Sequence, residues 1–227
     1  DAKVITTVVS TPMIDVVAPA ENVGVIKTLT GFKYIGEKIR QFENKEIDGT
    51  YILGFEESYG YLIGTHARDK DAIVSSLLIA EMAAFYNSKG TSIYKELQKL
   101  YQEFGYYLEG IKSVTLTGKD GIEKMANLMT ELRETVKDRT IDKNIKIKRD
   151  FKTKKELIVA TGEEKDILLP VENVIQFVLE DDTYITARPS GTEPKIKFYF
   201  SVNAPTKEEV ETKLNETMEK FVATLKL

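Results

Sequence analysis

The chain has 227 residues, with 32 Lys and Arg against 36 Asp and Glu, and a formal charge of −4. Its 42% hydrophobic and 30% charged residues indicate a folded chain and exclude disordered or collagen-like classes. The slight acidic excess gives no global attraction for nucleic acid or an anionic membrane, so we expect neither as a partner. With no Cys and a single His, His66, the sequence excludes disulfides, thiolate sites and multi-histidine zinc sites.

The sequence carries no membrane or secretion signal that we recognise. No apolar stretch approaches the ~20 residues that span a bilayer, and the first residues lack a charged region followed by an apolar core. We therefore expect a cytoplasmic protein. Because Asp1 leads directly into a β-branched run without an initiator methionine, we also expect a piece of a longer chain.

Strands and helices alternate through the first half. The pattern predicts strands at 3–9, 23–29 and 50–55, a short helix near 13–17, and an amphipathic helix carrying Ile35, Ile39 and Phe42. This alternation favours βαβ units and a small parallel sheet. Residues 71–86 are apolar on nearly every side, so we expect that helix to be mostly buried. The next helix, half exposed, should end at Gly105.

The pattern changes near 108–112, where we place a boundary between domains at 1–110 and 111–227. A helix bearing Met129 on its apolar face follows a strand at 111–116, and further strands are expected at 144–149, 173–179, 182–187 and 195–202. The charged stretch 143–155 is read as a solvated strand face. A capping box at Thr206 starts a final helix with the apolar stripe Val210, Leu214, Met218, Phe221 and Leu225. The fold class is therefore an α/β domain followed by an α+β domain with a mainly antiparallel sheet.

The loop from Ala187 to Lys195 concentrates groups that bind anions. Arg188 offers a planar fork for phosphate, Ser190 and Thr192 offer hydroxyl donors, and Gly191 lets backbone N–H groups approach closely. An ordinary polar hairpin turn would use the same residue types, so the composition leaves both interpretations open.

Two other loops should share one edge of the first sheet. Gly54-Phe55-Glu56-Glu57-Ser58 follows the third strand, and Thr30-Gly31-Phe32-Lys33 follows the second, where ligands bind in open parallel sheets. Glu56 and Ser58 could form hydrogen bonds with sugar hydroxyls. The alternative is that the Glu residues only lie in the first turn of a helix, where they suit the helix dipole.

Basic residues follow the acidic loop. The segment 66–71 brings His66, Arg68 and Lys70 close to Glu56 in sequence. His66 could titrate near neutrality and Lys70 could donate a proton or bind phosphate, while a lone His is more often structural.

Together these loops, in this order, resemble the α-D-phosphohexomutase superfamily, which contains phosphoglucomutases and phosphomannomutases. Residues 54–60 are similar to its sugar-binding Gly-Glu-x-Ser loop, with Phe55 inserted, and 187–195 to its phosphate-binding Arg-x-Ser-Gly-Thr-Glu-Pro loop. Residues 30–33 resemble its Thr-Gly-Trp/Phe-Lys loop, and 68–71 its Arg-Glu/Asp-Lys-Asp segment. The resemblance implies a third domain (1–110, sugar binding) and a fourth domain (111–227, phosphate binding).

The resemblance also implies the site residues. Lys70 and His66 would be catalytic, and the substrate would be bound by Thr30, Gly31, Lys33, Glu56, Ser58, Arg68, Arg188, Ser190, Gly191, Thr192 and Lys195. No metal ligand is expected in this chain. Mg²⁺ and phosphoserine would be supplied by missing amino-terminal domains, with glucose 1,6-bisphosphate as the activating intermediate.

The activity implied is that of a phosphoglucomutase, an isomerase that interconverts glucose 1-phosphate and glucose 6-phosphate through phosphoserine. The sugar loop continues as Tyr59-Gly60 rather than Gly-His, which favours the glucose branch. The alternatives are a phosphomannomutase, a phosphopentomutase or a non-catalytic sugar-phosphate binding relative. We expect the isolated chain to be inactive, because the family's phosphoserine and metal loops are not in it.

Overall fold

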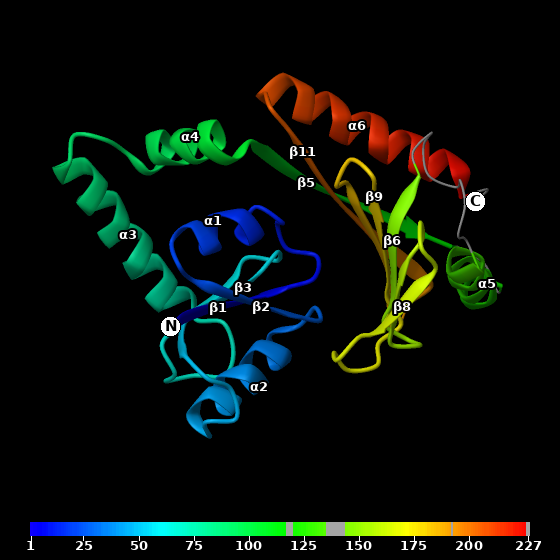
Figure 1. Cartoon of the computed structure of the whole chain (residues 1–227), viewed down its shortest axis with the longest axis horizontal. Helices are drawn as coiled ribbons and strands as arrows, with labels where there is room; N and C mark the ends of the chain where they lie inside the picture. The colour runs from blue at the N-terminus through cyan, green and yellow to red at the C-terminus, as the bar shows by residue number, and fades with distance from the viewer. Residues whose placement is uncertain (117–119, 135–143, 192, 226–227) are drawn as a thin grey trace. The chain divides into compact units, whose positions relative to one another are not determined.

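The computed structural model describes residues 1–116, 120–134, 144–191 and 193–225 of the chain (Figure 1). They form two compact units, Asp1–Gly105 and Tyr106–Leu227. The division falls where helix α4 ends at Phe104 and strand β5 begins at Tyr106. Among the described helices, none is both long and apolar enough to cross a lipid bilayer.

In the described part of the first unit, a four-stranded sheet has the order β2-β1-β3-β4. β1 pairs in parallel with both β2 and β3, while β4 pairs antiparallel with β3. Figure 1 shows α1 and α2 on opposite sides of this sheet. The elements are β1 (Ala2–Thr7), α1 (Ile14–Ala20), β2 (Gly24–Thr28), α2 (Phe32–Glu43), β3 (Thr50–Glu56), β4 (Gly60–Ile63), α3 (Ala72–Ser88) and α4 (Ile93–Phe104).

The core of the first unit lies between the sheet and α2. Ile35 and Ile39 are completely buried, and Phe42 packs against the same cluster, so the predicted apolar face of α2 is confirmed. The other buried members come from both layers: Ile5, Phe32, Tyr51 and Leu62. The predicted parallel strands are also confirmed, whereas β4 was not predicted and makes the sheet mixed.

The expectation that residues 71–86 are mostly buried is wrong. Within α3 only Ser75 is buried, and Ile73 is 84% exposed. α3 contacts β4, and Figure 1 shows the rest of the helix extending away from the sheet. The sequence pattern correctly showed that α3 lacks a polar face. It could not show which element covers the helix, and no described element of the first unit does.

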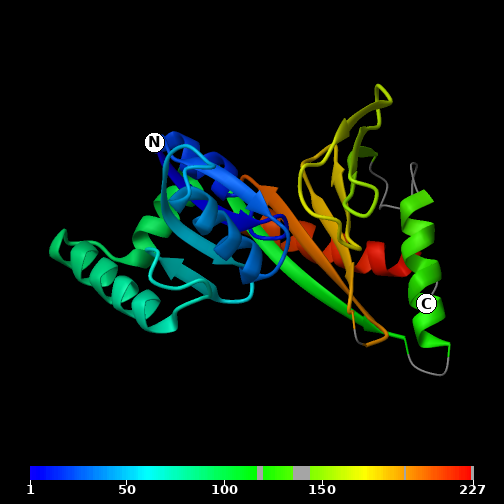
Figure 2. The same cartoon turned by 90° about the horizontal axis from the view of Figure 1, so that it is seen from below.

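In the described part of the second unit, a seven-stranded sheet has the order β5-β11-β10-β9-β6-β7-β8, with every pairing antiparallel. Helix α6 lies along β11 and β5 (Figure 2). The elements are β5 (Tyr106–Thr115), α5 (Gly121–Glu134), β6 (Ile145–Asp150), β7 (Lys155–Ile158), β8 (Glu163–Asp166), β9 (Ile175–Leu179), β10 (Tyr184–Pro189), β11 (Lys195–Ala204) and α6 (Lys207–Thr224).

Helix α6 forms where the sequence predicts it. Thr206 and Glu209 make the reciprocal hydrogen bonds of a capping box, and the stripe of apolar residues faces the sheet. The Phe221 ring meets those of Phe198 and Phe200 edge-on, at centroid distances of 5.3 and 5.5 Å. These aromatic contacts fix α6 on β11. β11 begins at Lys195, where the phosphate-binding loop proposed from the sequence ends.

We predict that Phe221→Ala lowers the free energy of unfolding of the second unit by about 3–5 kcal/mol, because it opens a cavity among completely buried rings. Phe221→Leu should cost distinctly less, since it keeps most of the buried volume. Urea unfolding of both variants, followed by circular dichroism, measures the difference. Equal destabilisation by the two variants would contradict the packing argument.

Candidate functional site

Three strands of the first sheet end at the same edge. β1 lies between β2 and β3 and runs parallel to both, so the segments after Thr28 and Glu56 leave the sheet on the same side. Gly31 begins α2 with a φ of +122°, a conformation that L side chains rarely adopt. The predicted juxtaposition of the 30–33 and 56–58 loops at one sheet edge is thus confirmed.

The acidic loop is the tight turn between β3 and β4. Glu56 pairs with Gly60 across the hairpin, and residues 57–59 form the turn. Tyr59 has a φ of +62°, rare for a large residue, and its side chain is 92% exposed. A Cβ on Gly60 would lie 2.8 Å from Cγ of Glu56 and 3.1 Å from Cδ of Lys70. Glycine at this position therefore lets the Glu56 and Lys70 side chains approach the hairpin backbone.

Glu56 is a buried carboxylate, only 7% exposed. Burial and the neighbouring charge of Glu57 raise the pKa of Glu56, in that order of size. Lys70 and a hydrogen bond from Ser58 act in the opposite direction and lower that pKa. The carboxylate is thus held in a setting that disfavours its charge, which increases its tendency to accept a hydrogen bond.

Lys70 lies between the two loops of this edge. Its Nζ is 5.9 Å from the centre of the Phe32 ring, at the start of α2, and 3.2 Å from Oδ1 of Asp69. Its side chain also passes close to Gly60 beside Glu56. The Lys70 side chain is half exposed.

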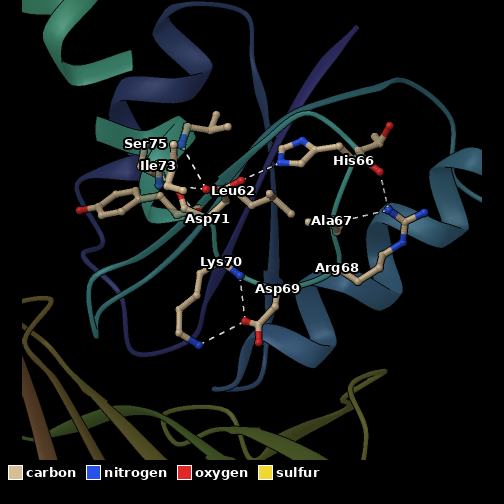
Figure 3. A network of polar contacts seen from close by, with 12 residues as sticks. Leu62, His66, Ala67, Arg68, Asp69, Lys70, Asp71, Ile73 and Ser75 are labelled. Atoms are coloured by element: carbon tan, nitrogen blue, oxygen red, sulfur yellow. Dashed lines mark hydrogen bonds and ion pairs between the residues drawn. The ribbon is translucent and has the colours of Figure 1, made fainter. Parts of the chain in front are cut away.

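His66 and Arg68 contact the backbone and side chains around them (Figure 3). His66 Nε2 lies 2.9 Å from Oδ2 of Asp71, the residue that caps α3 by accepting hydrogen bonds from two backbone N–H groups. These hydrogen bonds, from His66 first, lower the pKa of Asp71. Arg68 donates to the carbonyl oxygens of Thr65 and Ala67 and to Glu43. Both side chains thus stabilise the segment that carries Lys70.

Of the two remaining predicted residues of this unit, Thr30 and Lys33, Lys33 is exposed on α2. Its Nζ lies 4.7 Å from the centre of the Tyr34 ring. Thr30 is half-buried immediately before Gly31. Both residues lie at the same sheet edge as Glu56, in agreement with the sequence prediction.

The second group of predicted residues surrounds a surface pocket of about 260 Å³ between β10 and β11. Arg188 and Lys197 pair directly across the two strands, and Lys195 lies on the same face two residues before Lys197. The pocket is lined by Arg188, Pro189, Ser190, Gly191, Glu193, Lys195 and Lys197. Thr192, also predicted here, lies outside the described residues.

Two hydrogen bonds within the 190–195 loop hold the loop that closes this pocket. Ser190 N donates to Lys195 O at 2.7 Å, and Glu193 N donates to Ser190 Oγ at 3.3 Å. Gly191 is exposed, with no atom near enough to meet an added Cβ. These contacts constrain the loop and leave Gly191 facing open space.

Charge is unbalanced in the pocket. Three cationic side chains share it with one carboxylate, that of Glu193, and no described carboxylate forms an ion pair with Arg188, Lys195 or Lys197. Like charges directly opposite on paired strands repel each other. An anion bound between them would relieve this repulsion, and the planar Arg188 group suits the two oxygens of a phosphate.

Lys197 and Glu193 were not among the site residues predicted from the sequence. The period of two along a strand places Lys197 on the same face as Lys195, so strand alternation could have identified it. Among the described residues, no three acidic or histidine side chains converge as a metal site would require.

The first unit thus carries an acidic, hydroxyl-bearing turn, and the second unit carries a cationic pocket that suits phosphate. Residues 1–104 match the family model "Phosphoglucomutase/phosphomannomutase, alpha/beta/alpha domain III". The chain is 35% identical over 211 residues to a phosphoglucomutase of Staphylococcus aureus, and 33% identical over 207 residues to that of Staphylococcus haemolyticus. These alignments cover 93% and 91% of this chain, but 38% and 37% of the relatives.

Solved structures share the fold. The open form of pp63/parafusin, a phosphoglucomutase from Paramecium, matches 98% of this chain with a TM-score of 0.65 and 19% identity. A putative phosphomannomutase from Thermus thermophilus matches 97%, with a TM-score of 0.55 and 18% identity. This chain covers 37% and 36% of those two proteins. The chain belongs to the α-D-phosphohexomutase superfamily, and it spans little more than a third of the length of the relatives it matches.

We predict opposite shifts in the pKa of Glu56 for two neutralising substitutions. Glu57→Gln removes a neighbouring negative charge and should lower that pKa, whereas Lys70→Met removes a stabilising cation and should raise it. Carbon-detected NMR titration of the Glu56 carboxyl measures both, with Glu21→Gln as a remote control. Shifts in the same direction would contradict the assigned causes.

Proposed function

We propose that this chain is the sugar- and phosphate-binding part of a phosphoglucomutase, which interconverts glucose 1-phosphate and glucose 6-phosphate. The observation that carries the proposal is the cationic face formed by Arg188, Lys195 and Lys197 at the loop that resembles the family's phosphate loop. The similarity to phosphoglucomutases over more than nine tenths of the chain supports the glucose branch.

The two units take different parts of the substrate in this proposal. Glu56, kept in a setting that disfavours its charge, and Ser58, exposed on the turn, accept and donate hydrogen bonds to sugar hydroxyls. Thr30, Gly31 and Lys33 complete this edge of the sheet. In the second unit, Arg188, Ser190, Gly191 and Lys195 bind the phosphate that does not react, together with Thr192 by resemblance.

Proton transfer and the reacting phosphate are assigned to the 66–71 segment. Lys70 lies beside Glu56 and close to Phe32, where it can bind the reacting phosphate or donate a proton to the oxygen that leaves. His66 is the second candidate, acting from its contact with Asp71, and Arg68 anchors the segment. The His66 contact makes its contribution depend on the start of α3.

The phosphoryl group itself comes from elsewhere in the longer protein. A phosphoserine would transfer it to the hexose phosphate, and the resulting glucose 1,6-bisphosphate would return the phosphate from its other position to the serine. We assign that serine and the Mg²⁺ ligands to amino-terminal domains outside these 227 residues. The isolated chain should therefore bind sugar phosphates and show no turnover.

We predict that NMR titration of the 227-residue chain separates the two parts of the site. Glucose 1-phosphate should shift amide signals near both Glu56 and Arg188, whereas inorganic phosphate should shift only those near Arg188. Mannose 1-phosphate and ribose 1-phosphate, compared in the same way, test the phosphomannomutase and phosphopentomutase alternatives by their relative affinities. A lack of response at both loops to millimolar glucose 1-phosphate would overturn the proposal for this chain.

Substitution of Arg188 provides the matched test. Arg188→Ala should weaken phosphate binding by at least about tenfold, because it removes a charge-assisted bidentate contact, and Arg188→Lys should restore part of it. Arg40→Ala, at an exposed position of α2, makes the same charge change away from the pocket. Full turnover by the longer protein would distinguish an enzyme from a binding relative, which would bind the same ligands without reaction.

We also propose that the amino-terminal domains of the longer protein cover helix α3. Six large apolar side chains on this helix are exposed by 37% to 84%, namely Ile73, Leu77, Leu78, Ile79, Met82 and Phe85. An apolar surface of this kind marks an interface. The relatives are more than twice as long as this chain, and the matched family model is of their third domain. The two domains that would precede the third in such relatives are therefore the occupants that we propose.

We predict that the 227-residue chain binds a fluorescent apolar dye and that the longer protein does not. Leu77→Ser with Phe85→Ser should reduce dye binding by the 227-residue chain. Leu168→Ser with Val171→Ser, at residues of the second unit that are at least as exposed, should leave most of it. Equal dye binding by the longer protein would contradict the proposal. Dimers of the short chain that dissociate on substitution in α3, detected by light scattering, would assign the surface to a second copy instead.

A further inference from the structure

A buried threonine connects the end of β1 to the sugar-binding turn. Thr7, the last residue of β1, is completely buried, and its Oγ1 donates a hydrogen bond to Oε2 of Glu57 at 2.9 Å. Glu57 is half-buried and follows β3 directly. Because β1 and β3 are adjacent and parallel, their ends meet, and the bond joins residues 50 positions apart.

The proton count fixes the direction of the bonds around Thr7. A threonine hydroxyl carries one proton, and here that proton goes to the Glu57 carboxylate, which accepts only. At the 2.9 Å contact between Thr7 Oγ1 and Ser10 Oγ, Ser10 must therefore be the donor. The backbone N–H of Val9 also donates to Thr7 Oγ1, at 3.3 Å. The hydroxyl is thus fully used, in a chain of bonds running from Ser10 through Thr7 to Glu57.

This chain of bonds holds a turn that, among the described residues, is otherwise attached through its own hairpin. Within the described residues, the bond to Thr7 is the side-chain hydrogen bond that joins residues 57–59 to a neighbouring parallel strand. The turn also contains Tyr59 in a rare backbone conformation. Glu57 separates Glu56 from Ser58, so its position determines how these two side chains are presented together.

We propose that Thr7, supported by Ser10, is a positioning residue that orders the sugar-binding turn through Glu57. The inference rests on the proposed function, because it acts through Glu56 and Ser58 as sugar ligands. Glu57 itself accepts the bond from Thr7, on the side of the turn toward β1. Without this bond the turn loses its attachment to β1, and the two ligands lose their common orientation.

The chain contains a matched control for this proposal. Thr6 is also completely buried in β1, but its Oγ1 has no hydrogen-bond partner among the described residues. Successive side chains point to opposite faces of a strand, so Thr6→Val removes a hydroxyl from the same strand without touching the turn. Thr7→Val removes the hydroxyl that bonds Glu57, at nearly constant volume.

The test measures binding of glucose 1-phosphate and inorganic phosphate to variants of the 227-residue chain by NMR titration. Thr7→Val should weaken glucose 1-phosphate binding by about tenfold, the effect of losing one hydrogen bond to a charged group. Phosphate binding near Arg188 should not change. Thr7→Ser, which keeps the hydroxyl, and Thr6→Val should both stay within about twofold of the unsubstituted chain. Glucose 1-phosphate binding by Thr7→Val equal to that of Thr6→Val would overturn the proposal.

Substitution of Glu57, which accepts the same bond, tests whether the effect of Thr7→Val is only a folding defect. Glu57→Met, at the half-buried turn, should weaken glucose 1-phosphate binding like Thr7→Val, and the double variant should be no weaker than either single one. Additive losses would mean that the residues act independently and would overturn the proposal.

Residual dipolar couplings of the amides of residues 56–60 give a readout that needs no ligand. These couplings should change in Thr7→Val and remain unchanged in Thr7→Ser and Thr6→Val. If the unsubstituted chain bound no glucose 1-phosphate while these couplings changed as expected, the proposed function would fail and the positioning role of Thr7 would stand. Unchanged couplings in Thr7→Val would overturn the role itself.

Discussion

Parallel pairing of β1 with both of its neighbours is the constraint on which the site in the first unit depends. A parallel pair needs a crossover connection, so α1 and α2 carry the chain back to the start of each following strand. The ends of β1, β2 and β3 then gather at one edge. Residues from three distant parts of the sequence, Thr7, Lys33 and Glu56, reach the same edge without any long loop.

In the second unit, the pocket that suits phosphate is formed by an antiparallel hairpin rather than by parallel strands. An antiparallel hairpin places Arg188 opposite Lys197, and the short loop between the strands supplies backbone and hydroxyl groups. Repulsion between the two cations is tolerated because the completely buried residues of β10 and β11, such as Ile185 and Phe198, hold the strands together. Core packing thus stabilises an arrangement of charges that by itself is unfavourable.

Much of this organisation could be predicted from the sequence. A run of β-branched residues identified β1, and period-3.6 apolar patterns identified α2 and α6. The anion-binding loop was found from residue types that suit phosphate. Strand β4 was missed because its turn has Tyr59 in the left-handed position, where sequence rules expect Gly or Asn. Strands β7 and β8 were missed because their residues are mostly charged. The exposure of α3 could not be predicted, since an apolar pattern does not identify what covers it.

Tyr59 also limits how this position can vary among related proteins. A left-handed backbone at φ +62° accepts Gly or Asn most readily and disfavours β-branched residues. Selection for backbone conformation alone would therefore replace a large aromatic residue by one of the small ones. Relatives that keep an aromatic ring here, against that preference, would be retaining its exposed surface, whereas relatives with Gly would be retaining only the turn. The residues found at this one position in relatives thus distinguish selection for the backbone conformation of the turn from selection for contacts made by the exposed ring.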